Sequence, residues 1–314
     1  MKILITGASK GMGKGVAMAL AGFSQVHEII LLCRSEESGW VTMKELQGFS
    51  KNAKISMVQC DLSKLADVKK VIGEIENQHH HLDGLFINAG IGYAKTRIET
   101  QDCMDSHFQV NYLSQFLFTL NLLSLLENSK KGGRVIFNVT EFGKIRWDDM
   151  QMTRKWSYEK AIHQAMAAKR MFMVQLHHFY SRNKHGNVSF IGFRVHKTVW
   201  TDQINIIPSG MKIMARLAKL FGAFISIETC GKVMAPLFLE NREESLQRSG
   251  KLITWKKNRF EEMKQKYFTF SQPDLDRLWA GSLALCRDEK TLEVTNRLLP
   301  LKKQNSSKCN EKTP

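Results

Sequence analysis

A glycine-rich run near the start of the chain has the spacing of a phosphate-binding loop. It follows an apolar run, Lys2–Ile5, and leads into a helical pattern over Gly11–Phe23. In such a loop one glycine permits a tight turn, a second lets the backbone approach a pyrophosphate, and a third allows close helix packing. The free N–H groups at the start of the helix then bind the anion. The residues of this pattern are Thr6, Gly7, Ser9, Lys10, Gly11, Met12 and Gly13.

Two basic residues refine the predicted ligand. Lys10 lies inside the loop, and Arg34 follows the second apolar run, Glu28–Cys33. A site selective for NAD usually has an acid near the end of that strand to bind the ribose hydroxyls, and this run ends without one. A guanidinium there suits the additional phosphate of NADP. The sequence therefore predicts NADP(H) in preference to NAD(H), the alternative being that both cations are solvated surface charges.

Further motifs make the chain resemble the short-chain dehydrogenase/reductase family over about Lys2 to Leu285. After the third strand-like run stands Asp61-Leu62, which is similar to the family's adenine-contacting pair. Asn88-Ala89-Gly90 matches the family's NAG motif, and Asn111 matches the helix asparagine that supports its proton relay. The resemblance implies a Rossmann-like fold and a nicotinamide cofactor.

The retinol-dehydrogenase-like branch of that family is the more similar one. The run Arg134–Val139 resembles the strand before the catalytic serine, and Gly143–Ile145 with Asp149–Gln151 resembles the connection that follows. Towards the end of the chain, Ser249–Lys251 and Arg277–Trp279 also resemble that branch. The resemblance implies NADP(H)-dependent oxidation or reduction of retinoids, steroids and other lipophilic alcohols or carbonyls.

The catalytic residues of the family are not where the resemblance requires them. Its chemistry uses a serine, a tyrosine that gives or takes a proton, and a lysine four residues after the tyrosine, on the same helix face. Counted from Gly143 without a gap, Ile162 takes the tyrosine position and Met166 the lysine position. Glu141 takes the serine position. The one Tyr-x-x-x-Lys match, Tyr180–Lys184, comes too late in the order of elements to serve.

A second departure lies after the sixth strand, where the family has a proline and glycine whose backbone approaches the nicotinamide. Arg194 stands where that glycine is expected, and Thr198 matches the threonine that ends the motif. The adenosine half of the site is therefore predicted to be intact and the nicotinamide half altered. The residues predicted to bind the cofactor are Thr6, Gly7, Ser9, Lys10, Gly11, Met12, Gly13, Arg34, Asp61, Leu62, Asn88, Ala89, Gly90 and Thr198.

Three functions stay open on these residues. The first is a catalytically impaired family member that binds NADP(H) and acts as a binding or regulatory protein. The second is an active oxidoreductase in which Glu141 at the serine position, or His163 or Tyr158 near the tyrosine position, replaces the missing acid, with Asn111 in support. The third is an interaction module without a cofactor, which uses its basic surface or the stretch Ile213–Ile227 on a lipid or a partner.

Alternating apolar and amphipathic runs must position these residues. They predict a single α/β domain over 1–298, with a Rossmann-like doubly wound parallel sheet covered by helices on both faces, and a basic tail over 299–314. Helices are expected over Gln109–Leu126 and Tyr158–Tyr180, and strands over Arg134–Val139 and Asn187–Phe193. The stretch Ile213–Ile227 is predicted to form one helix, which either packs on the domain, the favoured interpretation, or serves as a lid or a membrane-surface helix.

The composition limits the classes of partner that the chain is expected to bind. The net charge of +16 favours a polyanionic cofactor or an anionic membrane surface, while no basic stripe interleaved with aromatics favours nucleic acid. The six cysteines show no zinc spacing, so no metal is expected, and no apolar run reaches about 18 residues. We expect a cytoplasmic protein, with peripheral membrane association as an alternative. A homodimer through Leu117–Leu126 and Met171–Tyr180, and a lipophilic small-molecule ligand, are further expectations.

Overall fold

One eight-stranded sheet forms the centre of the computed structural model, which describes residues 1–182, 186–195, 197–201, 207, 209–221, 223–264 and 269–299. The strand order is β10-β9-β6-β5-β4-β1-β2-β3, and every neighbouring pair is parallel except β9 with β10. The sheet strands are β1 (Lys2–Thr6), β2 (Glu28–Cys33), β3 (Lys54–Gln59), β4 (Gly84–Ile87), β5 (Gly133–Asn138), β6 (Val188–Arg194), β9 (Leu252–Lys256) and β10 (Arg259–Glu262). Two short strands, β7 (Thr198–Val199) and β8 (Phe224–Ile225), pair with each other outside it.

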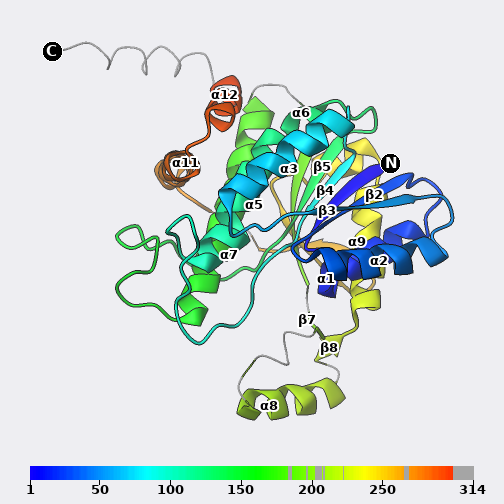
Figure 1. The fold of residues 1–314 in the computed structure, drawn as a ribbon, viewed down its shortest axis with the longest axis horizontal. Coiled ribbons are helices and arrows are strands. Elements are labelled where there is room, and N and C mark those ends of the chain that lie inside the picture. Colours follow the sequence, from blue (N-terminus) through cyan, green and yellow to red (C-terminus); the bar gives the residue numbers. More distant parts are fainter. Residues whose placement is uncertain are drawn as a thin grey trace.

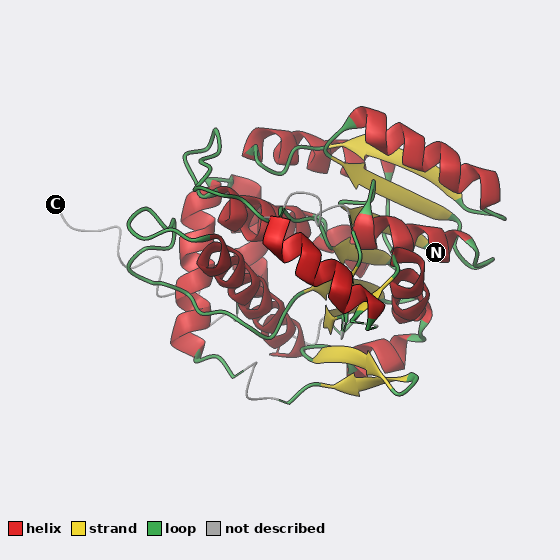
Figure 2. Ribbon diagram, turned by 90° about the horizontal axis from the view of Figure 1, so that it is seen from below, coloured by secondary structure: helices red, strands yellow, loops and turns green. Residues whose placement is uncertain are grey.

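Helices cover both faces of the sheet (Figures 1 and 2). On one face lie α1, α2 and α9, and on the other α3, α5 and α7, with α11 and α12 packed outside α5 and α7. The helices are α1 (Gly11–Ala21), α2 (Glu36–Phe49), α3 (Leu65–Gln78), α4 (Ser106–Phe108), the π-turn η1 (Gln109–Leu113), α5 (Ser114–Asn121), α6 (Leu123–Glu127), α7 (Tyr158–Arg182), α8 (Ser209–Leu220), α9 (Ile227–Leu239), α10 (Arg242–Gln247), α11 (Gln272–Cys286) and α12 (Glu289–Leu298).

The strands divide the apolar core into two layers because successive side chains point to opposite faces. In β1, Ile3 and Ile5 belong to the layer under α1 and α9, and Leu4 belongs to the layer under α5 and α7. In β5, Ile136 belongs to the layer under α1 and α9, and Phe137 belongs to the layer under α5 and α7. Strands apolar on both faces are typical of a parallel sheet buried between helices, and the predicted fold class is confirmed.

The strand order reverses between β1 and β4, so the connections from these strands leave to opposite faces. The carboxyl ends of β1 and β4 therefore open a crevice, the place where doubly wound sheets bind ligands. The glycine-rich run follows β1, and Asn88-Ala89-Gly90 follows β4. The topology thus places the two predicted motifs side by side.

Two expected helices are wrong in extent. The stretch Gln109–Leu126 is interrupted by η1 and by Leu122, so it forms three pieces. The stretch Ile213–Ile227 contains the end of α8, then β8, then the start of α9. The reason lies at Ser226, whose side chain accepts a hydrogen bond from Thr229 N and caps a new helix. Helices α10 and α12, strands β7, β8 and β10, and all of α9 after Ile227 were not predicted from the sequence.

Helices α11 and α12 cover the two helices that were predicted to pair between subunits. Leu117 and Leu120 are fully buried within the chain, and so are Met173 and Leu176. Because α12 packs on α5 and α11 packs on α7, these side chains contact their own chain. The homodimer therefore stays a prediction, and these buried side chains do not support it. The predicted tail lies outside the described residues except for Leu299. Among the described helices, none has the length and apolar character needed to span a bilayer.

Candidate nucleotide site

Backbone geometry makes the loop after β1 suitable for an anion. Gly7 and Gly11 have φ values of +66° and +58°, which favour glycine, and a Cβ at Gly7 would lie 2.9 Å from the Cα of Ala89. A Cβ at Gly13 would overlap with the carbonyl oxygen of Gly7. Helix α1 begins after Lys10 with no side-chain cap and no acid in its first turn. Its first N–H groups are therefore left to bind a phosphate.

Thr6 joins the two strands that flank the crevice. Its Oγ1 accepts hydrogen bonds from Asn88 N at 2.9 Å and Ala89 N at 3.0 Å, and donates to Phe86 O at 3.0 Å. The side chain of Asn88 donates in turn to Thr6 O at 3.0 Å. This network fixes the glycine loop against the Asn88-Ala89-Gly90 motif, so both would meet a ligand in one geometry.

The rim of the crevice offers a cation where the adenosine end of a dinucleotide would lie. Arg34 is exposed directly after β2, and no ion pair among the described residues involves it. Cys33, which ends β2, is buried, and burial raises the pKa of its thiol to about 11. The strand therefore ends in a neutral side chain followed by a free guanidinium.

The other predicted adenine and ribose contacts are held by short-range hydrogen bonds. Asp61 Oδ1 accepts from Ser63 N at 3.0 Å and from Ser63 Oγ at 2.7 Å. Leu62 is buried. Asn111, on η1, accepts from Ile91 N at 2.7 Å and lies against Gly90. The Asn111 amide therefore supports the backbone after Gly90, and its part in a proton relay stays a prediction.

The segment after β6 lies over the glycine loop. A Cβ at Gly11 would be 3.4 Å from the Cγ2 of Thr201, which follows β7. Thr198 begins β7, and its side chain lies outside the described residues. The strand places this predicted contact on the segment that covers the crevice, as the sequence predicts for the end of the altered nicotinamide motif.

Helix α7 carries apolar side chains at the two positions that the sequence predicts for the family's acid and cation. Ile162 and Met166 are half-buried and one helical turn apart. Neither can donate a proton or hold a charge. Tyr180, at the far end of α7, donates a 2.5 Å hydrogen bond to Glu127 and packs on Phe190. It therefore lies away from the crevice, as its late position in the sequence predicts.

Glu141 and Arg194, two of the departures from the family pattern, are paired. Arg194 Nε lies 2.5 Å from Glu141 Oε2, an ion-pair distance, although the N–H is not aimed at the oxygen as in a hydrogen bond. The Glu141 side chain is only 8% exposed. The pair joins the segments at the carboxyl ends of the neighbouring strands β5 and β6. It lies at the edge of the sheet where the sequence predicts the altered nicotinamide contacts.

Two buried cations, Lys169 and Arg170, lie on α7 near this pair. Taking Lys169 as the family's lysine would put Ala165, which cannot donate a proton, at the tyrosine position, and no role was predicted for Arg170. Arg170 donates to the carbonyls of Thr140 and Phe142, and burial lowers its pKa to about 10 while the nearby Glu141 charge raises it. Lys169 Nζ lies 3.5 Å from Asn138 O. Arg170 stands one turn after Met166, so the sequence contained a signal for it, but the family pattern concerns Met166 and does not predict it.

The alternative acids are placed differently. His163 lies against Phe142 with ring centroids 6.0 Å apart, on the loop side of α7. A Cβ at Gly143 would overlap with the carbonyl of His163, and the φ of +112° at Gly143 requires a glycine there. Tyr158, one turn before Ile162, packs edge-on to His107, and burial raises its pKa. None of these side chains occupies the tyrosine position.

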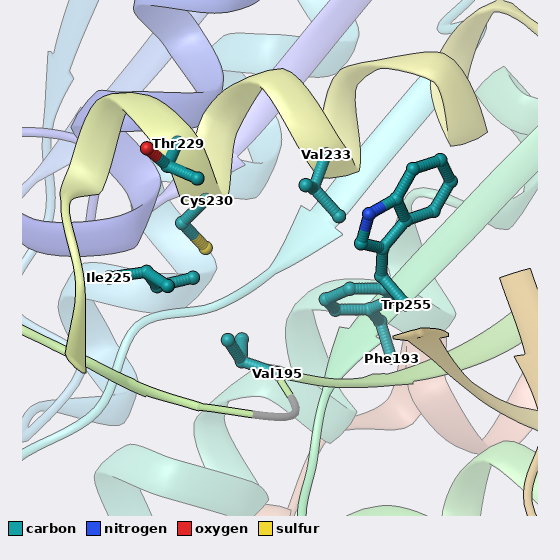
Figure 3. A pocket seen from close by; sticks show the side chains of 7 residues that line it. All are labelled: Phe193, Val195, Ile225, Thr229, Cys230, Val233 and Trp255. Atoms are coloured by element: carbon teal, nitrogen blue, oxygen red, sulfur yellow. The ribbon is translucent and has the colours of Figure 1, made fainter. Parts of the chain in front are cut away.

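A small apolar cavity lies beside the end of β6 (Figure 3). Its volume is about 140 Å³. Pockets that bury drug-sized ligands usually exceed about 300 Å³. It belongs to the layer under α1 and α9, so the sheet separates it from α7. Figure 3 shows the lining side chains, which are Phe193, Val195, Ile225, Thr229, Cys230, Val233 and Trp255.

The ion pair makes a testable contribution to stability. We expect Glu141→Gln to lower the free energy of unfolding by about 1–3 kcal/mol, because it leaves Arg194 and the buried Arg170 without a counter-charge. Arg194→Met alone should cost less, and the double variant should cost clearly less than the sum of the two. Urea unfolding of the four proteins measures this coupling. Strictly additive costs would show that the two side chains do not interact.

A parallel sheet with this strand order and a glycine loop at its reversal point defines a dinucleotide-binding type of α/β protein. The short chain dehydrogenase family model matches residues 1–152. Over these residues the chain is similar to the short-chain dehydrogenase/reductase family of oxidoreductases, and its similarity extends to the retinol dehydrogenases of that family.

Individual relatives show how far the similarity reaches. Human retinol dehydrogenase 13 is 30% identical over 179 residues, which are 55% of this chain and 53% of that protein. Mouse retinol dehydrogenase 12 is 26% identical over 298 residues, or 93% of this chain and 82% of that protein. The match thus spans about half the length of the first relative and most of the second.

A solved structure supports the fold. L-sorbose reductase from Gluconobacter frateurii, whose crystal structure contains NADPH and L-sorbose, has a TM-score of 0.62 and 18% identity to this chain. The superposition covers 81% of this chain and 94% of that one.

Proposed function

We propose that this chain binds NADP(H) through the loop after β1 and the Arg34 rim, and that it is impaired in the hydride and proton transfer of its family. The adenosine half of the crevice supports the first part: free N–H groups at the start of α1, an unpaired Arg34 and no acid at the end of β2. NADPH in the crystal structure of L-sorbose reductase accords with a nicotinamide cofactor in this fold.

The Glu141–Arg194 ion pair is the observation that carries the second part. The pair engages the Glu141 carboxylate, which could otherwise have replaced the missing acid, and it lies next to the carboxyl ends of β5 and β6, where this proposal puts the nicotinamide. If Ile162 and Met166 on α7 take the tyrosine and lysine positions, as the sequence predicts, the site lacks the family's tyrosine–lysine couple. General acid–base help is typically worth about 10²–10⁴-fold in rate, and that help would be missing.

Nucleotide binding is the first test. We expect NADPH to bind more tightly than NADH, and Arg34→Ala to weaken NADPH about tenfold while leaving NADH nearly unchanged, since a guanidinium–phosphate contact is lost. Titration by nucleotide fluorescence measures both. The matched control is Arg154→Ala, which removes an exposed arginine on the connection before α7. Equal losses for NADPH and NADH in Arg34→Ala would contradict the assignment of the 2′-phosphate.

Turnover is the second test. The protein should bind NADPH without measurable reduction of retinoid, steroid or quinone carbonyls. A lipophilic ligand beside the nucleotide is part of the proposal, in keeping with the retinol dehydrogenases among the relatives. Reduction at rates typical of an enzyme would overturn the impairment and turn attention to Glu141→Gln and His163→Ala. Failure to bind either nucleotide would leave the interaction-module alternative.

A further inference from the structure

Helix α8 carries an apolar stripe that nothing in the described part of the chain covers. Ile213, Leu217 and Leu220 follow one another at helical spacing and are 60%, 52% and 81% exposed. Met214 and Phe221 extend the stripe and are 72% and 87% exposed. Five of the eleven large apolar side chains that are exposed in the described residues thus lie within one short segment, whereas the others are scattered.

A row of cations runs beside the apolar stripe. Lys212, Arg216 and Lys219 have the same spacing as Ile213, Leu217 and Leu220, displaced by one residue. The helix contains no acid, and no carboxylate among the described residues lies within ion-pair distance of these three cations. The helix is therefore apolar on one side and positively charged on the adjoining side, in a chain whose net charge is +16.

The helix is attached so that it extends from the body of the protein. Figure 1 shows α8 beyond the β7–β8 pair, away from the central sheet. At its base Trp200 packs edge-on to Phe224, with ring centroids 5.1 Å apart, and Lys219 Nζ lies 4.1 Å from the centre of the Trp200 ring. These contacts join the cationic side to the strand pair and leave the apolar stripe facing outward.

We propose that α8 is an interfacial helix that docks on an anionic lipid bilayer. The apolar stripe would enter the boundary between headgroups and acyl chains, and Lys212 and Arg216 would meet lipid phosphates and carboxylates. Each cation near such a surface contributes about 1 kcal/mol of attraction, which salt screens. Charge complementarity selects this occupant, because a second copy of the same helix would bring cation against cation. The argument for this docking does not depend on whether the chain binds a nucleotide.

Sedimentation of the full chain with vesicles tests the proposal. We expect binding to phosphatidylcholine vesicles that contain about 30% phosphatidylserine, weaker binding to pure phosphatidylcholine, and a loss as salt rises to about 0.5 M. The double variant Leu217→Glu/Phe221→Glu should reduce the bound fraction at least about tenfold, since it places charge in the apolar boundary. Lys212→Gln/Arg216→Gln should weaken binding to the anionic vesicles only.

Leu292→Glu is the matched control, because Leu292 on α12 is 50% exposed and lies outside the stripe. It should bind vesicles as the unaltered chain does, and circular dichroism should show all variants folded. No binding of the unaltered chain to anionic vesicles would overturn the proposal, as would an equal loss in Leu292→Glu. A dimer that Leu217→Glu/Phe221→Glu converts to a monomer, with no vesicle binding, would instead assign the stripe to self-association.

Discussion

Gly231→Ala should lower the free energy of unfolding by about 3 kcal/mol or more, because the helices α1 and α9 touch through their backbones. A Cβ at Gly231 would overlap with the carbonyl oxygen of Gly15, and a Cβ at Gly15 would overlap with that of Ile227. Backbone atoms in two packed helices cannot move aside as a flexible side chain can. Thermal unfolding should show a lower Tm, by roughly 10 °C at about 2–4 °C per kcal/mol.

A second glycine-to-alanine change separates this packing effect from helix propensity. Gly73 lies inside α3, and nothing lies within 4 Å of a Cβ built there. Gly73→Ala should therefore be neutral or stabilise by up to about 1 kcal/mol, because alanine favours the helix. If Gly231→Ala were as harmless as Gly73→Ala, the two helices would not be in backbone contact.

Lys169→Met should make the protein more stable near pH 7. Lys169 is 1% exposed, and burial lowers the pKa of its ammonium to about 7, against about 10.4 in an unfolded chain. From about pH 7 to about pH 10 the unfolded state binds a proton that the folded state does not, so this lysine destabilises the fold. The cost is up to a few kcal/mol, at about 1.4 kcal/mol for each unit by which the pKa is lowered.

The pH dependence identifies the cause. Stability of the unaltered chain relative to Lys169→Met should rise as pH increases through this window, and the gap should close near pH 10, where both states hold a neutral amine. Urea unfolding at several pH values measures the difference, in which the other titrating groups cancel. Lys70→Met, at a 75% exposed side chain on α3, is the control and should show no such trend. If the free energy of unfolding of Lys169→Met and of the unaltered chain changed in parallel with pH, burial would not lower the pKa of this lysine.

The sequence predicted the backbone geometry of the adenosine half of the crevice better than the contacts in its nicotinamide half. Glycine positions and apolar periods are local signals, and they placed Gly7, Gly11 and the strands from Lys2 to Phe193 correctly. The Glu141–Arg194 pair was not predicted, because ion pairing depends on which strands become neighbours. The missed signal was one acid and one base at the ends of successive strands, each where the family has a small residue. Helix α12, with few apolar residues, could be recognised only by what it covers.

The backbone contact between Gly15 and Gly231 has a consequence for regulation. Helix α1 begins at the glycine loop, and α9 follows α8 and β8 in the chain. The proposed nucleotide site and the proposed membrane-binding helix are therefore both joined to the packed helix pair α1–α9. If docking to a bilayer shifted α9, and α1 with it, the affinity for nucleotide would change. By thermodynamic linkage, nucleotide would then change the affinity for the bilayer by the same factor. The fraction of the protein bound to a membrane would then depend on whether the nucleotide is bound.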